Sequence, residues 1–308
     1  MTKIKEFFEH FFHHSHTEEA GFFDEVILHG LFETLKIIPF LLIAYIIMEF
    51  IEHKASDKVK AFLTRSGSLG PLVGGALGAI PQCAFSAVAS NLYAGRIITF
   101  GTLLAVFLST SDEMLPLLIS SGATPTRIIV IIGYKLIVGI AVGFLINLYL
   151  RITKGKRRPI NVEDICEEEG CHCEKGIFIS ALIHTAKISG FILAVSIAVN
   201  CAVYFIGADT LGTILGDLGV ISYLASAFIG LIPGCATSVA LTSLAISGVI
   251  EDGVMLSGLF SGAGIGLFVL LKVNKSWREN LMVMAILVGT GFVFGLLYDL
   301  LGIGGWFI

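Results

Sequence analysis

Two nine-residue stretches of the chain place a proline and a cysteine at the same spacing inside apolar sequence. The first, GAIPQCAFS, covers residues 78–86, and the second, GLIPGCATS, covers residues 230–238. Proline suits the first position of a helix, and the helix N-terminus that follows favours an oxyanion or a thiolate. Each stretch therefore predicts a half-helix whose cysteine, Cys83 or Cys235, can bind a soft metal or metalloid. The alternative is that each cysteine only fills space at a tight tip.

Two adjacent carboxylates form a second candidate group. The stretch FLSTSDEMLP (Phe107–Pro116) places Asp112 and Glu113 well inside an apolar segment. A carboxylate within a membrane is costly and usually lines a cavity or carries protons or cations. The matching downstream stretch, LFSGAGIG, has glycine where the first has Asp112, so the site is expected to be asymmetric. A structural alternative is an ion pair between one of the two acids and Lys135 in the next helix.

The cysteine tips and the acidic segment together make up a predicted substrate site near the middle of the membrane. Its predicted substrate-binding residues are Pro81, Gln82, Cys83, Ser86, Ser109, Ser111, Asp112, Glu113, Pro233, Gly234, Cys235, Ser238 and Ser261. Within this set the predicted metal ligands are Cys83, Cys235, Asp112 and Glu113. A proton or ion relay is predicted at Glu33, Lys135 and His184, and simple pairing near helix ends is the alternative for Glu33 and His184.

Two polar segments outside the apolar sequence also carry metal-binding residue types. The loop CEEEGCHCEK holds Cys166, Cys171, His172 and Cys173, which can surround a zinc-like ion as an accessory site, although it lacks the paired C-x-x-C spacing of structural zinc sites. Near the start of the chain, EHFFHHSHTEE holds four histidines among acids. The alternative for both segments is a solvated polar loop or tail.

Apolar helices must position all of these residues. Of the 308 residues, 55% are hydrophobic and 14% charged, and apolar runs of about 20 residues recur, enough to cross a hydrocarbon core of roughly 30 Å. We therefore expect an all-α polytopic membrane protein. The first segment lacks the apolar stretch of a cleaved signal peptide, and no basic block indicates nucleic-acid binding. Continuous helices are predicted at Val26–Phe50, Ile97–Ile119, Arg127–Leu150, Ile177–Phe205, Gly253–Leu271 and Leu281–Leu300.

Two further apolar stretches, 66–95 and 219–248, are rich in glycine and serine and have a proline at their centres. Because an interior proline breaks a helix, each stretch is either one kinked crossing or a re-entrant hairpin. Lysine and arginine gather near residues 54–65, 151–158 and 272–278, and such clusters mark cytoplasmic loops. If all three clusters are cytoplasmic, the chain must cross the membrane six times. The two proline-containing stretches are then hairpins that enter from opposite sides.

An internal repeat supports this arrangement. Pro81 aligns with Pro233 at an offset of 152 residues, and Cys83 then meets Cys235 and Ser109 meets Ser261 without a gap. Three crossings in each half force the halves into opposite orientations, which is the inverted-repeat architecture of secondary transporters; a duplicated scaffold without transport is the alternative. The predicted divisions are a histidine- and acid-rich segment at 1–25, a first repeat at 26–150, a cytoplasmic loop at 151–176 and a second repeat at 177–308.

The stretches GPLVGGALGAIPQCAFSA, STSDEMLPLL and GLIPGCATSVALTSL, with the Cys–His–Cys loop, resemble a bacterial family of ten-helix heavy-metal exporters. Members carry labels such as arsenic efflux protein or manganese transporter, and the family is similar to the organoarsenical efflux permeases. The resemblance covers nearly the whole chain after residue 25. It implies a multi-pass protein of the bacterial inner membrane, and counting each hairpin leg as a helix brings the predicted segments to ten. The related permeases have more cysteine near the first tip than the single Cys83.

The leading hypothesis is a secondary exporter of a heavy metal or metalloid that works by alternating access, with proton coupling as an option. Two thiols suit an arsenical, whereas carboxylates suit a hard divalent ion such as manganese, and the acidic peripheral segments favour the divalent ion. No nucleotide-binding motif, enzyme-like arrangement or resident cofactor is expected. The bilayer and the transported ion are the expected partners, with a homodimer as an option. The alternatives are an anion or sulfur-compound permease and a membrane-anchored metal sensor.

Overall fold

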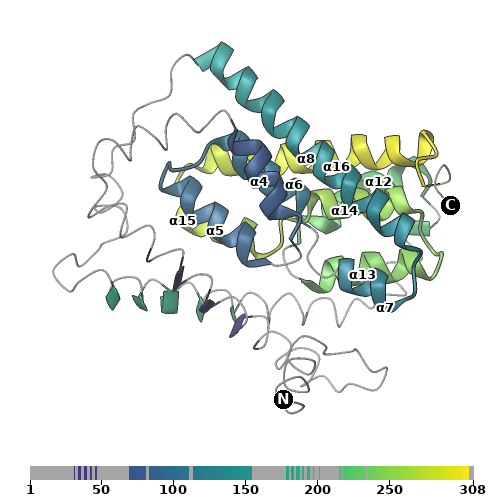
Figure 1. Ribbon diagram of the computed structural model, residues 1–308, viewed down its shortest axis with the longest axis horizontal. Helices are drawn as coiled ribbons and strands as arrows, with labels where there is room; N and C mark the ends of the chain where they lie inside the picture. The colour runs from purple at the N-terminus through teal and green to yellow at the C-terminus, as the bar shows by residue number, and fades with distance from the viewer. Residues whose placement is uncertain are drawn as a thin grey trace.

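The protein was studied as a computed structural model of all 308 residues. The structure describes residues 69–80, 83–110, 114–154, 218–232 and 235–304, with scattered positions between 31 and 46 and between 178 and 216. The elements in this part of the chain are all α-helical (Figure 1). They are α4 (Gly70–Gly78), α5 (Cys83–Ala94), α6 (Phe100–Ser109), α7 (Met114–Ser120), α8 (Pro125–Lys154), α12 (Val220–Gly230), α13 (Cys235–Ile246), α14 (Asp252–Ser261), α15 (Ile265–Val273) and α16 (Trp277–Leu300).

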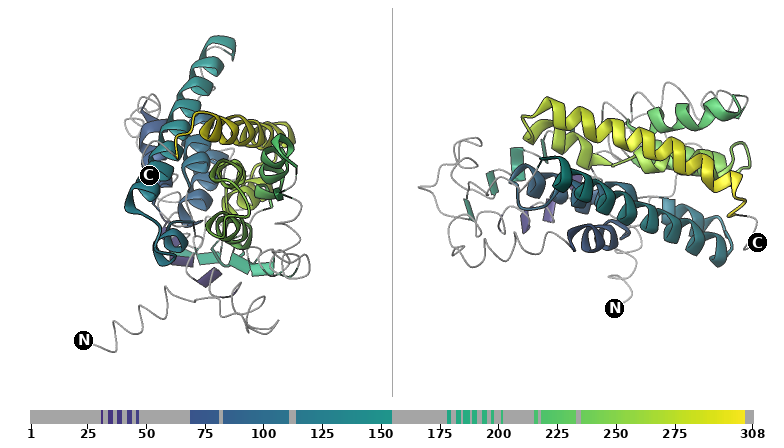
Figure 2. Two further views of the ribbon diagram at one scale, coloured as in Figure 1. Left: turned by 90° about the vertical axis from the view of Figure 1, so that its right-hand side faces the viewer. Right: turned by 90° about the horizontal axis from the view of Figure 1, so that it is seen from above.

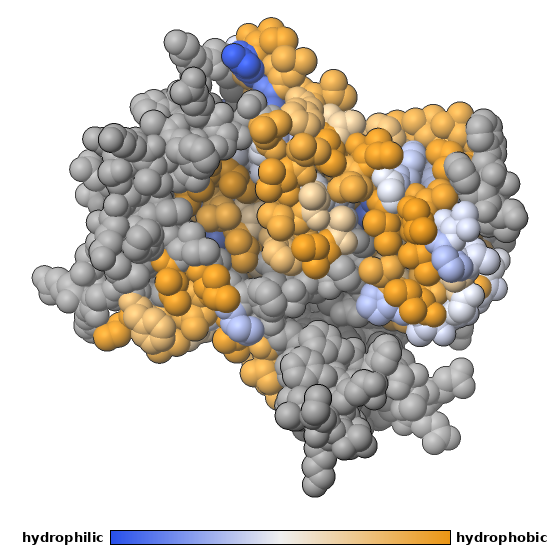
Figure 3. Space-filling view, in the orientation of Figure 1, coloured by the Kyte–Doolittle hydropathy of each residue, from blue (hydrophilic) through white to orange (hydrophobic). Residues whose placement is uncertain are grey.

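The composition and surface of these helices are those of a polytopic membrane protein. Among the described residues, four stretches are long and apolar enough to cross a bilayer, namely Phe100–Ser120, Pro125–Thr153, Asp252–Val273 and Trp277–Leu300. On α8, the large apolar side chains of Ile129, Ile137, Leu145 and Ile152 are exposed at intervals of seven or eight residues, so they form one outward stripe. Apolar residues cover much of the surface in Figure 3, as expected of a face that meets lipid.

The bounds of the helices recur at the same offset of 152 residues that relates the two cysteine motifs. Helix α5 maps onto α13 and α6 maps onto α14 at both ends, while α8 and α16 begin at equivalent residues. The packing recurs as well: α4 lies on α6 as α12 lies on α14, and α5 packs against α15 as α13 packs against α7. The repeat in the sequence is therefore also a repeat of helices and of their contacts.

The close contacts of glycines show the relative directions of neighbouring helices. An added Cβ on Gly70 would meet Thr102 and one on Gly78 would meet Ser109, so α4 and α6 lie side by side in the same direction. A Cβ on Gly139 would lie 3.1 Å from the carbonyl oxygen of Ala105, and Asn147 lies beside Gly101, so α8 runs antiparallel to α6. Small residues allow this close approach, as they do between helices in membranes.

Two predicted continuous helices are broken in the structure, which corrects the sequence analysis. The segment predicted at Ile97–Ile119 contains two helices, α6 and α7. Helix α6 ends before Thr110, whose ψ of 129° is not helical. The segment predicted at Gly253–Leu271 contains α14 and α15, separated at Gly262–Gly264, and Gly264 has a φ of +54° that favours glycine. The residues at the two breaks, TSDE at 110–113 and GAG at 262–264, are short interruptions of long apolar runs, and for this reason the predicted helices were drawn through them.

The two broken segments form the core of the bundle. Every residue of α6 is buried, and so is every residue of α14 except Asp252 at its start. Their leucine, valine and phenylalanine side chains make up much of a continuous apolar cluster. Figure 2 shows the remaining described helices arranged around this centre. The helix ends created by the two breaks are therefore enclosed by protein on both sides.

Candidate functional site

Each proline-cysteine segment lies beside the helix break of its own half. At the end of α4, a Cβ on Gly78 would lie 2.5 Å from the carbonyl oxygen of Val106 and would meet Ser109, the last residue of α6. At the end of α12, a Cβ on Gly230 would overlap the backbone of Gly258 in α14. The residues that follow, 79–83 and 231–235, thus start next to the breaks. Among the described residues, the helix that leads into each cysteine motif thus ends against the central helix of its own half.

The two halves meet at the break between α14 and α15. Ser86 of α5 is fully buried, and a Cβ on Gly266 would lie 2.6 Å from its carbonyl carbon. Ser90, one turn later, donates from Oγ to the carbonyl oxygen of Gly266 at 2.6 Å. On the other side of the break, a small pocket is lined by Gly262 and Gly264 together with Ser238 of α13. The segment 262–266 therefore lies between the N-terminal parts of α5 and α13, and it brings Ser86 and Ser238 into one region.

The serines at the ends of the central helices already donate their hydroxyl hydrogens. Ser109 Oγ donates to the carbonyl oxygen of Ala105 at 2.7 Å, and Ser261 Oγ lies 3.2 Å from the carbonyl oxygen of Leu287 in α16. A hydroxyl that has given its hydrogen to backbone retains its lone pairs. Both serines are buried, and each offers an acceptor oxygen to a cation at the break.

Lys135 crosses from one half to the other beside the same break. It belongs to α8, it is 1% exposed, and its Nζ donates to the carbonyl oxygen of Leu259 in α14 at 2.9 Å. The ammonium also lies 5.6 Å from the ring centroid of Phe260. A cation near the last carbonyls of a helix is favourable because these groups carry the negative end of the helix dipole. The predicted relay residue Lys135 is therefore a buried donor that links α8 to the C-terminal end of α14.

Many of the predicted site residues lie outside the described part of the chain. Cys83 and Cys235 are the first described residues of α5 and α13, but the placement of their side chains, and so their mutual distance, stays a prediction. Among the described residues no group of three or more histidine, cysteine or acidic side chains is placed to hold a metal ion. Outside the described residues lie Pro81, Gln82, Ser111, Asp112, Glu113, Pro233, Gly234, Glu33, His184, Cys166, Cys171, His172 and Cys173.

The start of each central helix is capped by a side chain from the long helix of its half, a feature that sequence reasoning missed. Asn147 Oδ1 accepts from the backbone N–H of Gly101 at 3.1 Å, and Asp299 Oδ1 accepts from that of Gly253 at 3.0 Å. The two pairs are related by the offset of 152 residues. Asp299 Oδ2 also contacts the hydroxyl of Tyr223 at 2.8 Å. The signal that could have revealed this cap was the recurrence of an Asn or Asp at the matching position.

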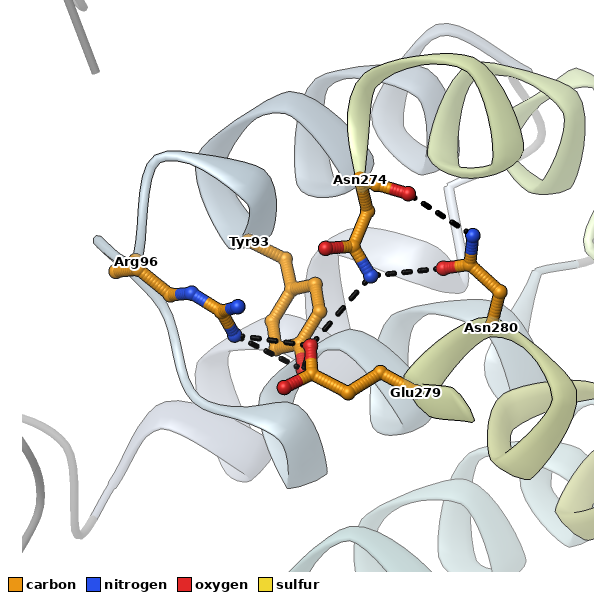
Figure 4. A network of polar contacts seen from close by, with 5 residues as sticks. All are labelled: Tyr93, Arg96, Asn274, Glu279 and Asn280. Carbon is orange, nitrogen blue, oxygen red and sulfur yellow. Dashed lines mark hydrogen bonds and ion pairs between the residues drawn. The ribbon is translucent and has the colours of Figure 1, made fainter. Parts of the chain in front are cut away.

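A second polar cluster joins the loop before α6 to the start of α16 (Figure 4). Glu279 Oε2 accepts from Arg96 Nη1 at 3.0 Å and from the hydroxyl of Tyr93 at 2.8 Å. Asn274 Nδ2 donates to Asn280 Oδ1 at 2.7 Å and faces the same carboxylate. Burial by itself lowers the pKa of Arg96, but its contacts with Glu279 and Tyr93 outweigh burial and raise it. This cluster lies at one end of the bundle and not at the breaks.

The comparisons with known proteins agree with the membrane architecture. A model of the family described as "Putative, 10TM heavy-metal exporter" matches residues 32–220. No protein of curated function and no solved structure matches the chain. The matched range includes the first cysteine motif, the acidic segment, α4 to α8 and the Cys–His–Cys loop.

Proposed function

Because the chain belongs to this family of ten-helix heavy-metal exporters, we propose that it is a secondary transporter that moves a metal or metalloid ion out of the cytoplasm by alternating access. The observation that carries the proposal is the break at 262–264, which lies between α5 of one half and α13 of the other. Helix ends that meet between two halves supply unpaired backbone groups at the place where transporters hold their substrates.

The proposed architecture is two halves of opposite orientation, each with a re-entrant hairpin. Since α4 and α6 run in the same direction with Gly70 level with Thr102, both begin at the same end of the bundle. Only the five residues 95–99 connect α5 to α6, so α5 must return the chain to the end from which α4 came. The same relations among α12, α13 and α14 support a second hairpin that enters from the opposite end.

The distribution of charge supports the orientation of the bundle. Among the described residues, the end where α6 begins carries most of the basic side chains, and the end where α14 begins carries the acids Glu251 and Asp252. By the positive-inside rule the first end is cytoplasmic, and the proposed location is the bacterial inner membrane. The basic residues at that end are Arg96, Arg151, Lys154, Lys272, Lys275 and Arg278.

The proposed substrate is a divalent metal such as manganese, with an arsenical as the second option. Cys83 and Cys235 would contribute sulfur, Asp112 and Glu113 would contribute carboxylates, and the carbonyl groups freed at the breaks would complete the ligand set. Oxygen ligands suit a hard divalent ion. Glu33 and His184 would carry protons, and the loop at 166–173 would take up the ion on the cytoplasmic side.

Lys135 favours a second candidate, an anion permease. Its buried ammonium lies at the C-terminal end of α14, between the halves, where a fixed positive charge suits an oxyanion. The variant Lys135→Leu separates the candidates. An oxyanion permease would lose transport at least tenfold, whereas a metal-cation exporter would keep or increase metal efflux.

The direct test is metal and metalloid efflux from cells that express the full chain. Cys83→Ser, Cys235→Ser and Asp112→Asn are expected to restore sensitivity to manganese or arsenite, while wild-type protein protects. Cys201→Ser is the matched control because Cys201 is a cysteine of the apolar sequence outside the proposed site.

Three results would contradict the proposal. Full protection by all three site variants would remove the proposed ligands. Loss of protection only when residues 166–173 are deleted would favour the metal sensor. Higher intracellular metal on expression of the wild-type chain would reverse the direction of transport.

A further inference from the structure

Two ion pairs join the halves of the bundle. Arg127 of α8 holds Asp252 of α14 through both carboxylate oxygens, with Nε 3.0 Å from Oδ2. Arg96, in the loop before α6, lies 3.0 Å from Glu279 of α16. In each pair one partner comes from the first repeat and the other from the second, so each pair closes the boundary between them.

These two pairs lie at opposite ends of the molecule. Asp252 is the first residue of α14, and its neighbour Gly253 contacts Asp299 near the end of α16. Glu279 lies in the first turn of α16, more than five helical turns away from Asp299. One pair therefore closes the boundary at the acidic end and the other closes it at the basic end.

The offset of 152 residues relates the two pairs. Arg127 and Glu279 are equivalent, since each is the third residue of the long helix of its half. Each reaches the segment that leads into the buried central helix of the other half, at Asp252 for α14 and at Arg96 for α6. The signs of the charges are exchanged, although the partner residues Asp252 and Arg96 are not equivalent at this offset. One arrangement used at both ends, with the signs reversed, indicates a common role.

We propose that Arg127–Asp252 and Arg96–Glu279 are the outer and inner gates of the transporter and that they break in turn. The inference rests on the proposed alternating-access function. To open a path between the halves at one end, the charges at that end must separate, while the pair at the other end keeps the opposite side closed. Both pairs are formed in this structure, which is accordingly an occluded state.

The two gates differ in strength. The side chains of Arg127 and Asp252 are 23% and 16% exposed, and they form a two-point contact. The side chains of Arg96 and Glu279 are 49% and 33% exposed, and Arg96 contacts only one carboxylate oxygen of Glu279. Two-point guanidinium–carboxylate contacts are strong, and water weakens exposed pairs. The inner gate therefore opens more easily from the occluded state, which suits an exporter that loads its ion from the cytoplasm.

The test follows labelling of one cysteine from each side of the membrane. Ser238→Cys in the full chain places a thiol in the pocket beside the break, and its modification by a membrane-impermeant maleimide is read by mass spectrometry in right-side-out and inside-out vesicles. Arg127→Ala should raise labelling from outside about tenfold, because it removes charge-assisted hydrogen bonds. Glu279→Ala should raise labelling from inside about threefold, as expected for a more exposed pair.

Controls keep the result interpretable. Arg151→Ala removes an exposed arginine of α8 outside both gates and should change neither rate, and the exchange Arg127→Asp with Asp252→Arg should restore the low outside rate. Asp252→Asn serves as the milder variant if Arg127→Ala does not reach the membrane.

The proposal is overturned if the gate variants raise labelling equally from both sides, if they leave both rates unchanged, or if the exchanged pair fails to restore closure. Labelling needs no metal, so the two proposals fail separately. Side-specific labelling without metal efflux leaves the gates and removes the proposed function. Metal efflux without side-specific labelling leaves the proposed function and removes the gates.

Discussion

The two halves of the bundle cap their central helices in the same way but with different chemistry. In the first half, Asn147 accepts from the N–H of Gly101 and donates to Thr99 Oγ1 at 2.9 Å, so the cap is neutral. In the second half, Asp299 accepts from Gly253, and the hydroxyl of Tyr223 contacts both Asp299 and Glu251 at 2.8 Å. The repeat has kept the helix geometry and changed the charge.

This difference places two carboxyl groups around one hydroxyl in the second half. A tyrosine hydroxyl has only one hydrogen to donate. The carboxyl groups of Asp299 and Glu251 therefore compete for the hydrogen of Tyr223. The neutral cap of the first half has no such competition, because the amide of Asn147 supplies both a donor and an acceptor.

The largest loss of stability is expected from adding a side chain at a glycine where the backbones of two helices touch. A Cβ on Gly230 would overlap the backbone of Gly258, which cannot rotate away, whereas part of the overlap at Gly78 is with the side chain of Ser109. Gly230→Ala is expected to lower the free energy of unfolding by about 3 kcal/mol or more and Gly78→Ala by less. Thermal melting of the detergent-solubilised protein measures both.

Matched controls for this prediction are Gly133→Ala in α8 and Gly289→Ala in α16, since an added Cβ at either position meets nothing within 4 Å. Both should melt at or above the wild-type temperature, because alanine favours helix more than glycine does. Equal melting of all four variants would show that the glycine contacts do not set the spacing of the helices.

A smaller effect is expected from removing the caps themselves. Asp299→Ala should lower the free energy of unfolding by about 2 kcal/mol and Asn147→Ala by about 1 kcal/mol, since hydrogen bonds to charged groups are the stronger ones. Asp299→Asn gives the second half the chemistry of the first and should recover most of the loss. A larger loss from Asn147→Ala than from Asp299→Ala would contradict the comparison.

The smallest effect is expected from deleting single tyrosine hydroxyls. Tyr93→Phe removes one of the donors to Glu279, which keeps its contact with Arg96, and should cost about 0.5 kcal/mol. Tyr223→Phe removes the hydroxyl between Glu251 and Asp299 and should cost more, because the two carboxyl groups then face each other without a bridge. Melting curves of the two variants, recorded side by side, decide whether the acidic end depends more on its tyrosine.

The sequence predicted the helical class well because this class depends on local pattern, while the inverted orientation of the two halves stays a prediction. The alignment of Cys83 with Cys235 reproduced the bounds of α5 and α13, and the hydrophobic runs located α8 and α16. The breaks at Thr110 and at 262–264 were missed because the polar residues TSDE and the glycines at these positions are short interruptions between long apolar runs. The contact between Arg96 and Glu279 was missed because its partners are 183 residues apart and no local pattern relates them.

The candidate site was predictable in part. Reasoning from the repeat led to Ser86 and Ser238, and the structure places each of them next to the segment 262–266; their role in binding a substrate stays a prediction. The role of Lys135 as a link to the carbonyl group of Leu259 could not be read from sequence, because it depends on how α8 packs against the other half.

Helix α8 is longer than the hydrocarbon core of a membrane is thick, and it also contacts the buried helix α6. Its 30 residues span about 45 Å at 1.5 Å per residue, which exceeds a hydrocarbon core of roughly 30 Å. Such an excess is accommodated by helix tilt and by cations that reach the interface, and Arg151 lies exposed near the end of the helix. The same helix holds the start of α6 through the two hydrogen bonds of Asn147, to Gly101 and to Thr99. The helix that is long enough to sense the thickness of the bilayer is thus also the helix that caps the buried centre.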